Sequence, residues 1–477
     1  MHSVSGSMLF NSAIFVLLFL IVYSMYWFLP VRGKHYLIIV ASLLFYSWYS
    51  VPFLLLFLAL IVWNYYVSLT LLNRKLRWLL ALTVILDLSV LGFFKYFYLL
   101  AHTVGYALGI PYIQELRANW EQDYDVVIIL PIAISFYTFQ IIAYVVDTYR
   151  GVINEPLAPR RFFVFILFFP QFVAGPILRS QDFIPQIDTP NIDPERMMRG
   201  LMLLIQGTIK KVLIADNLGK FTGPVWMNPE GYDALVLYTL PFSFMARIYC
   251  DFSGYTDMAR GMAKLMGYEI PENFSGPFLS TSMSELWTRW HITLSTWLRD
   301  YIYIPLGGSK LGEFRTVMNL LITMGLGGLW HGATWNMLFW GVYIGFFLVA
   351  EREMRVAGIR LLPEGAIGNT FRRLYVVFVF GMSALFFASP DLESTGAILS
   401  GMFSFQRGEP VTGFETVFFL IILSFVFNYL QYRPRLHDKL LERPRLQYAL
   451  TIAGTFITGF LVYLYGDASG SFIYFAF

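Results

Sequence analysis

Charged residues are scarce in this sequence, since Asp, Glu, Lys and Arg make up 14% of its 477 residues. Soluble domains carry about 25%, so the two or three soluble domains that the length would otherwise suggest are excluded. Hydrophobic residues reach 57%, and the mean hydropathy is +0.59. These values predict a protein embedded in a membrane.

Cysteine is nearly absent as well. Cys250 stands alone, which excludes an internal disulfide framework and a multi-cysteine metal site. We expect no bound metal and no bound cofactor. The sequence also lacks a P-loop, a G-x-S-x-G elbow, an H-E-x-x-H motif and a dinucleotide fingerprint. The net charge of +3 does not call for a nucleic-acid partner, because cytoplasmic loops of membrane proteins are rich in Lys and Arg. Any chemistry must rest on isolated polar side chains.

Long apolar runs are what the sequence has in abundance. About 20 apolar residues cross a hydrocarbon core, and this template predicts an all-α, polytopic membrane protein with about 11–13 transmembrane or re-entrant helices. We expect one membrane-embedded domain over residues 1–477, with a motif core at about 162–341 between N-terminal helices (1–150) and C-terminal helices (370–477). The candidate spans are Met8–Leu29, Tyr36–Tyr49, Pro52–Leu72, Trp78–Leu100, Val126–Val146, Phe162–Leu178, Leu201–Ile214, Leu235–Phe252, Val317–Leu329, Trp335–Glu351, Leu374–Ala388, Thr416–Gln431 and Tyr448–Tyr465.

The loops predict an orientation. Basic clusters such as Arg74–Arg77 and Arg352–Arg360 mark cytoplasmic loops, whereas the acidic connection Gly105–Asp125 should lie outside. Met8–Leu29 is too long for a signal-peptide core and has no basic residue before it, so we expect a retained first span with the N-terminus outside.

Two segments should not span simply. Phe162–Arg199 contains Pro170, Pro176 and Pro185, which predicts a helix that breaks inside the membrane, and Ser282–Pro305 mixes ionisable residues with tryptophans. Irregular backbone at membrane depth is tolerated only where it is buried in protein or lines a cavity. Both segments therefore point to a site inside the protein.

His331 is the most informative residue of the chain, because it lies in the apolar, glycine- and tryptophan-rich stretch Gly325–Gly341. An intramembrane ionisable group marks a functional site by default, and a neutral imidazole could take the proton of a hydroxyl nucleophile near neutral pH. The alternative is that His331 is a hydrogen-bonding contact between packed helices, with Trp330 and Trp335 as interface aromatics.

Two further stretches concentrate polar residues. In Trp287–Tyr301, His291 could bind substrate or orient a partner, and Arg289 and Arg299 could bind phosphates. Alternatively, these arginines reach lipid headgroups and Asp300 pairs with one of them. In the stretch Arg247–Arg260, two carboxylates six residues apart would face different sides of a helix, which favours an Arg247–Asp251 ion pair over a metal pair.

Together these motifs resemble the membrane-bound O-acyltransferase family, and within it the bacterial branch that O-acetylates alginate. The resemblance is strongest from Phe162 to Gly341, and Ser471–Phe477 is similar to that branch's ending. The segments that carry it are Phe169–Ile177, Asp251–Asp257, Trp287–His291, Asp300–Gly308 and Trp330–Gly332.

The resemblance implies a helical membrane enzyme built around a central funnel or tunnel, in which His331 occupies the catalytic histidine position and His291 the second characteristic one. Around them we expect substrate contacts. These candidate substrate-binding residues are Trp330, Trp335, Asn336, Arg289, Trp290, Arg299, Asp300, Asp251 and Ser253.

The function that follows is an O-acetyltransferase of the bacterial inner membrane. It would take acetyl from cytoplasmic acetyl-CoA and pass it to an exported or cell-envelope polysaccharide, with His331 as general base. The resemblance also implies an extracytoplasmic, SGNH-hydrolase-like partner that completes transfer to the sugar, since the chain shows no soluble domain that could do so. Contact with membrane lipid is expected as well. One alternative is D-alanyl transfer from a carrier protein towards teichoic acid, and another is a transporter or flippase.

Overall fold

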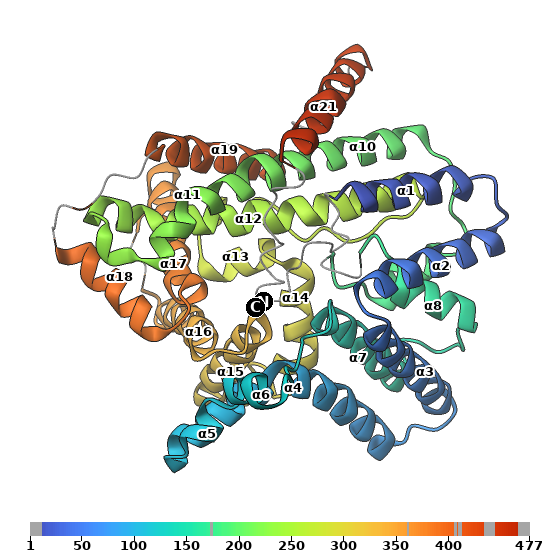
Figure 1. The fold of residues 1–477 in the computed structure, drawn as a ribbon, viewed down its shortest axis with the longest axis horizontal. Coiled ribbons are helices and arrows are strands. Elements are labelled where there is room, and N and C mark those ends of the chain that lie inside the picture. Colours follow the sequence, from blue (N-terminus) through green and yellow to red (C-terminus); the bar gives the residue numbers. More distant parts are fainter. Residues whose placement is uncertain are drawn as a thin grey trace. The chain divides into compact units, whose positions relative to one another are not determined.

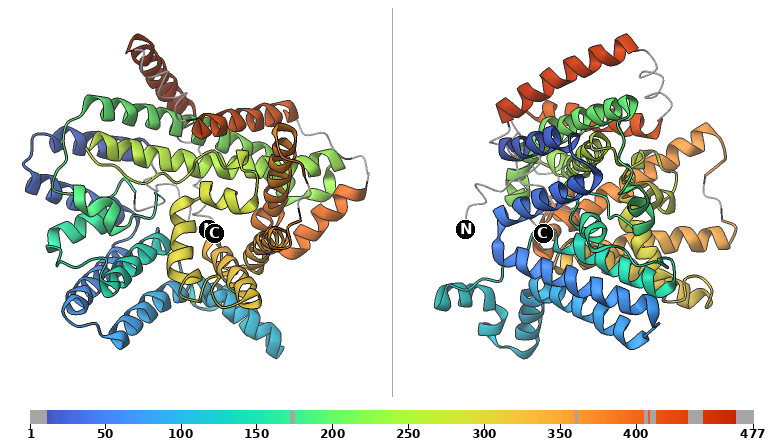
Figure 2. Two further views of the ribbon diagram at one scale, coloured as in Figure 1. Left: turned by 180° about the vertical axis from the view of Figure 1, so that it is seen from behind. Right: turned by 90° about the vertical axis from the view of Figure 1, so that its right-hand side faces the viewer.

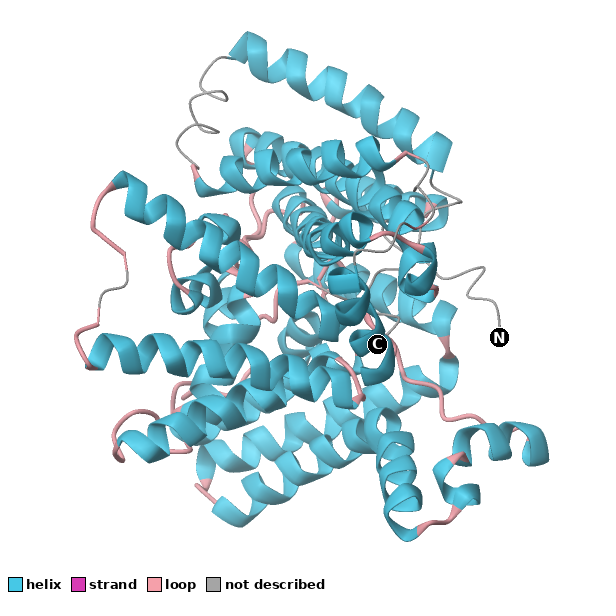
Figure 3. Cartoon of the chain, turned by 90° about the vertical axis from the view of Figure 1, so that its left-hand side faces the viewer, coloured by secondary structure: helices cyan, strands magenta, loops and turns pink. Residues whose placement is uncertain are grey.

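The computed structural model describes residues 12–171, 175–359, 362–404, 408, 413–433 and 444–465. Over these ranges the chain is helical and forms no strand (Figure 3), apart from one isolated antiparallel bridge between Phe274 and Trp290. The predicted ending Ser471–Phe477 and the first residues of the span Met8–Leu29 lie outside the described residues. The prediction of an all-α fold is confirmed.

Four of the described helices are long and apolar enough to cross a membrane. They are α3 (Val51–Asn73), α4 (Arg77–Leu108), α17 (Ala366–Ala388) and α19 (Phe414–Tyr432). Each covers a span expected from the sequence, and together with the family reported below they confirm a multi-pass membrane protein. The total of about 11–13 spans stays a prediction.

Internal contacts divide the chain into two compact units, which consist essentially of residues 14–191 and 192–477. In the first unit α3 packs against α7, where the rings of Phe57 and Tyr137 stack at 4.0 Å. The single domain expected over 1–477 stays a prediction. Besides α3 and α4, the first unit contains α1 (Ala13–Tyr26), α2 (Val31–Tyr49), α5 (Pro111–Gln114), α6 (Leu116–Tyr124), α7 (Ile134–Arg150), α8 (Pro159–Leu167), α9 (Ser180–Phe183) and η1 (Ile184–Gln186).

Prolines decide where two helices of this unit begin or end. The helix α8 ends at Leu167, and Pro170 and Pro176 follow in irregular backbone. The helix therefore breaks in this segment as expected, and the position of the break inside the membrane stays a prediction. The span predicted at Val126–Val146 is wrong at its start, because α7 begins only at Ile134. Pro131 lacks a backbone donor, and Ala133 takes a left-handed φ of 62° before the helix.

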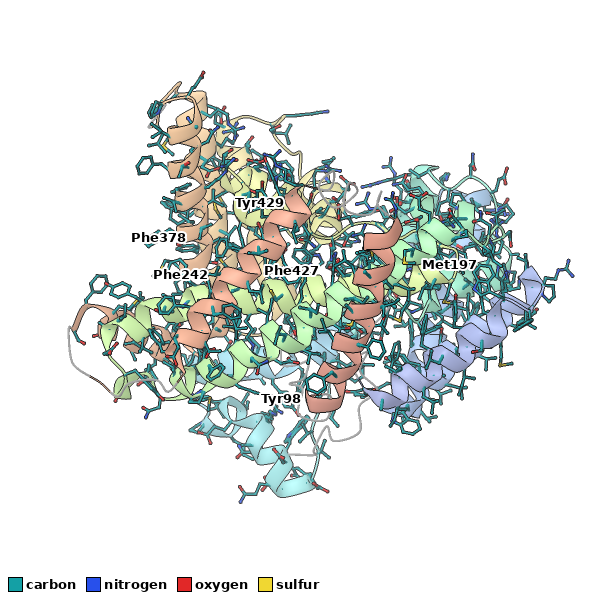
Figure 4. The ribbon with its side chains drawn as sticks, turned by 90° about the horizontal axis from the view of Figure 1, so that it is seen from above. Tyr98, Met197, Phe242, Phe378, Phe427 and Tyr429 are labelled. Atoms are coloured by element: carbon teal, nitrogen blue, oxygen red, sulfur yellow. The ribbon has the colours of Figure 1, made fainter. Side chains whose placement is uncertain are left out.

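The second unit is built around α12 (Ala234–Leu265), which is buried on nearly all sides and begins at Asp233, whose side chain accepts a hydrogen bond from the backbone N–H of Val236. The helix α10 lies along it (Figure 1), and Phe242 of α12 faces Phe378 of α17, with ring centroids 6.4 Å apart (Figure 4). The remaining elements of this unit are α10 (Pro194–Thr208), η2 (Ile209–Ala215), α11 (Asp216–Met227), η3 (Pro229–Gly231), η4 (Pro277–Leu279), α13 (Met283–Arg289), α14 (Ile292–Leu298), η5 (Arg299–Tyr303), α15 (Glu313–His331), α16 (Trp335–Val356), α18 (Leu392–Ser404) and α21 (Pro444–Tyr465).

The helices α15 and α16 form a tight antiparallel hairpin in this unit (Figure 2). A Cβ on Gly328 would lie 2.1 Å from the carbonyl oxygen of Met337, and one on Gly341 would lie 2.2 Å from that of Met324. Only glycine allows backbones to come this close. The close approach fixes His331, at the end of α15, against the first turns of α16.

The segment Ser282–Pro305 is not a simple span, as expected. It forms two seven-residue helices, α13 and α14, followed by the π-helix η5. Ser282 caps α13 by accepting from the N–H of Glu285, and the Glu351 carboxylate accepts from the N–H of Met283 at 2.8 Å. The chain turns between the two helices at His291.

Candidate active site

His331 is the last residue of α15 and is 3% exposed. Its imidazole is enclosed by aromatic rings, with centroids 5.0 Å from Trp330, 5.1 Å from Trp340 and 5.3 Å from Phe387. Such walls exclude water, and electrostatic interactions strengthen when water is excluded. His331 therefore has the surroundings of a base kept apart from solvent.

His291 is fully buried and holds an unusual backbone conformation, with a φ of 42° between α13 and α14. The left-handed conformation raises the energy of a residue that has a Cβ, and such strain persists where the neighbouring structure enforces it. The backbone N–H of Ser275 donates to the carbonyl oxygen of Arg289, and the backbone N–H of Ile292 donates to the carbonyl oxygen of Asn273, at 3.0 Å each. These two bonds hold the turn and direct the imidazole into the interior.

The two histidines belong to one cluster. Their ring centroids are 6.4 Å apart, and Trp330 contacts both, at 5.8 Å from His291 and 5.0 Å from His331. We call the set of His291, His331, Trp330, Trp340 and Phe387 the histidine cluster. It joins three elements of the second unit, namely the α13–α14 turn, the α15–α16 hairpin and α17.

Asn273 anchors the cluster and was not predicted from the sequence. Its side-chain oxygen lies 3.2 Å from His291 Nδ1 and accepts from both the backbone N–H and the hydroxyl of Thr293, at 3.2 and 2.9 Å. Within the described part of the chain, His291 Nε2 and Asn273 Nδ2 are buried without a hydrogen-bond partner. Unsatisfied buried polar atoms are costly, so these two atoms are candidates to bond a ligand.

A small cavity of about 20 Å³ adjoins His331. This volume holds roughly one water molecule, so an acyl group and an acceptor can enter only if the walls move. The lining residues are Phe244, Met245, Ile248, Trp290, His331, Trp340, Phe380, Ser383, Ala384 and Phe387. The predicted contact residue Trp290 is thus placed beside the predicted base.

Several other predicted contact residues lie elsewhere in the structure. Trp335 is 44% exposed at the start of α16, and the Arg299 side chain is 61% exposed and bonded to its neighbour Asp300 at 2.7 Å. Arg289 pairs with Glu285 at 3.0 Å and lies over the Tyr432 ring at 4.8 Å. None of these four candidates lines the cavity beside His331.

Asn336 is buried, but its amide is used to connect helices. Its Nδ2 donates to the Ser389 carbonyl at 3.1 Å and to the Thr395 hydroxyl at 3.4 Å, which ties α16 to the end of α17 and to α18. Trp340, one turn further along α16, donates to Ser383 at 3.1 Å. These bonds hold the wall of the histidine cluster in place.

Asp251 belongs to a second buried polar group. Its carboxylate forms an ion pair with Nζ of Lys211, a residue of η2, at 2.6 Å. The Arg247–Asp251 pair expected from the sequence stays a prediction. Lys211 also bonds Asp216, and Lys210 bonds Asp257, each at 2.7 Å. We call these five residues the ionic cluster. Ser253 is buried on the same helix, α12.

A much larger cavity, of about 730 Å³, opens at the other end of α13. Small-molecule sites occupy about 300–1,000 Å³. Arg355 and Arg372 line it with Ser282, Glu351 and Tyr375, and Arg355 belongs to the basic stretch Arg352–Arg360 that is expected to be cytoplasmic. The helix α13 connects this cavity with the turn at His291.

Asn273, Phe387 and Trp340 belong to the site but are not among the residues that the sequence predicts. Trp340 lies in the stretch Gly325–Gly341. Because it follows Trp335 by five residues, the two side chains lie on different faces of a helix, so Trp340 could have been expected to face the interior if Trp335 faces outward. Asn273 and Phe387 come from segments distant in sequence, so only the tertiary fold reveals them.

The fold and the buried histidine pair define a class of membrane enzyme, and the profile of the membrane-bound O-acyltransferase family matches residues 159–388. The chain belongs to the membrane-bound O-acyltransferase family, and the matched range includes both histidines. The protein is accordingly an O-acyltransferase. Membership of this family favours neither a transporter nor a flippase.

Named relatives cover most of the chain. A probable alginate O-acetylase of Azotobacter vinelandii is 37% identical over 421 residues, which cover 83% of this chain and 78% of that protein. A peptidoglycan O-acetyltransferase of Helicobacter pylori is 32% identical over 433 residues, 83% of this chain and 80% of that protein. A teichoic acid D-alanyltransferase of Streptococcus thermophilus is 28% identical over 291 residues, 54% of this chain and 70% of that protein.

Proposed function

We propose that this protein is an O-acetyltransferase of the bacterial inner membrane that transfers acetyl from cytoplasmic acetyl-CoA to an exported or cell-envelope polysaccharide. The observation that carries the proposal is the histidine cluster, in which two buried imidazoles lie 6.4 Å apart behind aromatic walls. Relatives named for O-acetylation of alginate and of peptidoglycan support acetyl as the transferred group and a glycan as its destination.

In the proposed reaction His331 is the general base. The acceptor hydroxyl oxygen attacks the thioester carbonyl carbon while its proton passes to the imidazole of His331. The C–S bond then breaks, the ester stays with the acceptor, and the proton returns from His331 to the thiolate of coenzyme A. Because a thiol has a pKa near 8.5, its thiolate leaves with little acid assistance.

The large cavity at α13 suits the donor. Its volume of about 730 Å³ is large enough for a nucleotide-sized ligand, and Arg355 and Arg372 offer guanidinium groups, which recognise phosphate well. With the phosphates held there, the acetyl thioester would extend along α13 towards His291. The small volume beside His331 then requires the aromatic walls to move before reaction.

The acceptor side calls for a partner. We propose an extracytoplasmic, SGNH-hydrolase-like protein that completes transfer to the polysaccharide, because the described residues contain no second domain outside the helical units. D-alanyl transfer is the second candidate, and the relative named as a teichoic acid D-alanyltransferase favours it, although that match covers 54% of the chain.

Radiolabelled acetyl-CoA tests the proposal. The full-length protein in proteoliposomes should transfer the labelled acetyl group to an added glycan only when a candidate partner is present on the acceptor side. D-alanyl carrier protein, supplied in place of acetyl-CoA, should give no transfer. Absence of labelled product with every partner, or transfer from the D-alanyl carrier alone, would overturn the acetyl assignment.

A further inference from the structure

The bonds of Asn273 determine which nitrogen of His291 carries a proton. The Asn273 side-chain atom that faces Thr293 accepts from a backbone N–H, so it must be the oxygen. A nitrogen in that place would oppose the backbone N–H of Thr293, donor against donor. The same oxygen lies 3.2 Å from His291 Nδ1, and an oxygen acceptor bonds only a protonated ring nitrogen.

The other nitrogen of His291 is therefore a lone-pair acceptor. The ring is 0% exposed, Phe252 and Trp330 lie against it at 4.6 and 5.8 Å, and no ion pair joins it to a carboxylate in the described ranges. A buried ring with no counter-charge is neutral. In a neutral imidazole with Nδ1 protonated, Nε2 can only accept a hydrogen bond.

We infer that Asn273 is a positioning residue, which fixes His291 as the Nδ1–H tautomer so that Nε2 accepts a hydrogen bond from the hydroxyl of the acyl acceptor. Of the two reacting groups, the hydroxyl has a proton to donate and the thioester has none. The inference rests on the proposed O-acyl transfer, in which His331 takes the proton and His291 holds the oxygen in line. It adds the role of Asn273 and the acceptor as the ligand of His291.

Tautomer measurement tests the first half without any substrate. Protein labelled with ¹⁵N-histidine should show a pyrrole-type Nδ1 and a pyridine-type Nε2 for His291, identified by the signals that vanish in H291Q. The variant Asn273→Leu should lose this pattern, and Thr293→Val, which removes only the second donor to the same oxygen, should keep it. A pyrrole-type Nε2 in the unsubstituted protein would overturn the inference.

Kinetics test the second half. Loss of a group that orients a catalytic side chain costs about 10–100-fold in activity, so we expect Asn273→Leu to lower kcat by up to about 100-fold while the KM for acetyl-CoA stays constant. Asn273→Asp retains an oxygen acceptor and should restore most of the rate. Its carboxylate would stabilise protonated His291, which shifts the rising limb of the pH profile upward by about one unit.

The outcomes separate the two proposals. If the unsubstituted protein transfers acetyl but Asn273→Asp and Asn273→Leu share its pH profile and lose equal activity, Asn273 merely stabilises the turn and the inference fails. If no variant transfers acetyl yet the tautomer is as stated, the proposed donor fails and the assignment of the nitrogens stands. His331 is the neighbouring titratable group, so the pH shift is compared with the profile of Thr293→Val, in which both histidines remain.

Discussion

The second unit contains two buried polar groups that solve the problem of burial in opposite ways. In the ionic cluster every lysine bonds a carboxylate, at 2.6–2.7 Å, and the side chains are at most 5% exposed. At the histidine cluster, by contrast, His291 Nε2 and the Nδ2 of the adjoining Asn273 find no partner among the described residues. Each lysine of the ionic cluster is thus paired with a carboxylate, whereas the two unpartnered atoms at the histidine cluster are available to a ligand.

Local backbone accounts for the contrast. The π-helix η2 carries both lysines into the interior beside α12, where Lys210 also lies 5.7 Å from the rings of Tyr249 and Phe427, the latter on α19 (Figure 4). The left-handed turn at His291 instead separates α13 from α14 and leaves Nε2 of the buried ring without a partner among the described residues. The π-helix η2 thus brings opposite charges together, whereas the turn at His291 leaves a polar ring atom without a neighbouring partner.

The largest expected effect comes from removing the base in the histidine cluster. His331→Gln should lower turnover by about 1,000-fold, within the range of general base catalysis, and leave the thermal midpoint unchanged. Labelled acetyl transfer and a fluorescence-detected thermal melt measure the two quantities. His102→Gln, an exposed histidine of the first unit, is the matched control and should behave like the unsubstituted protein. Full activity in His331→Gln would remove the catalytic assignment.

The ionic cluster should give the reverse result. Lys210→Met leaves the buried Asp257 carboxylate without its partner, which costs about 3–5 kcal/mol, so folded protein should decrease while activity per folded molecule is kept. The double variant Lys210→Met with Asp257→Leu removes both charges and should recover most of the thermal stability. If the double variant is as unstable as the single one, the pair has no separable role in stability, and the comparison between the clusters fails.

Much of the fold could be predicted from apolar periodicity and breakers. Long apolar runs predicted the helices α3, α4, α17 and α19, and the prolines of Phe162–Arg199 predicted the end of α8. The start of α7 could not be predicted in this way, because Ala133 adopts a left-handed conformation that composition does not reveal. Contacts such as Lys211–Asp251 depend on how η2 packs against α12, and a sequence pattern restricted to one helix offers Arg247 as a partner.

The site was predictable where its residues are costly to bury. His291 and His331 could be identified because an imidazole in an apolar run needs a reason, and the structure brings both into one cluster. Arg299 and Trp335 were chosen for their chemistry alone and lie in exposed positions. Asn273 could not be found, since a single Asn in a loop carries no signal until its three bonds are seen.

A subtler change tests whether the hairpin keeps the histidine cluster in register. Gly341→Ala places a methyl group 2.2 Å from the Met324 carbonyl, which should separate α15 from α16 and cost about 1–3 kcal/mol. A displacement of His331 by about 1 Å lowers the rate by about 100-fold. Gly396→Ala, where no atom lies within 4 Å, is the control and should keep activity and stability. Equal behaviour of the two variants would show that the close approach is not required.

The smallest expected effect concerns the cavity of about 730 Å³ at α13, which is proposed to hold the donor and is lined by no residue of either cluster. If Arg355 contacts a phosphate of acetyl-CoA, Arg355→Gln removes one charge-assisted hydrogen bond of about 1.5–3 kcal/mol; with partial replacement by water we expect the KM for acetyl-CoA to rise about 10-fold and kcat to stay constant. The control is Arg315→Gln, an exposed arginine of α15 that does not line the cavity. Initial rates over a range of donor concentrations separate the two constants. A fall in kcat without a change in KM would connect Arg355 with the histidine cluster through α13 rather than with the donor, whereas equal KM values in both variants would place the donor elsewhere.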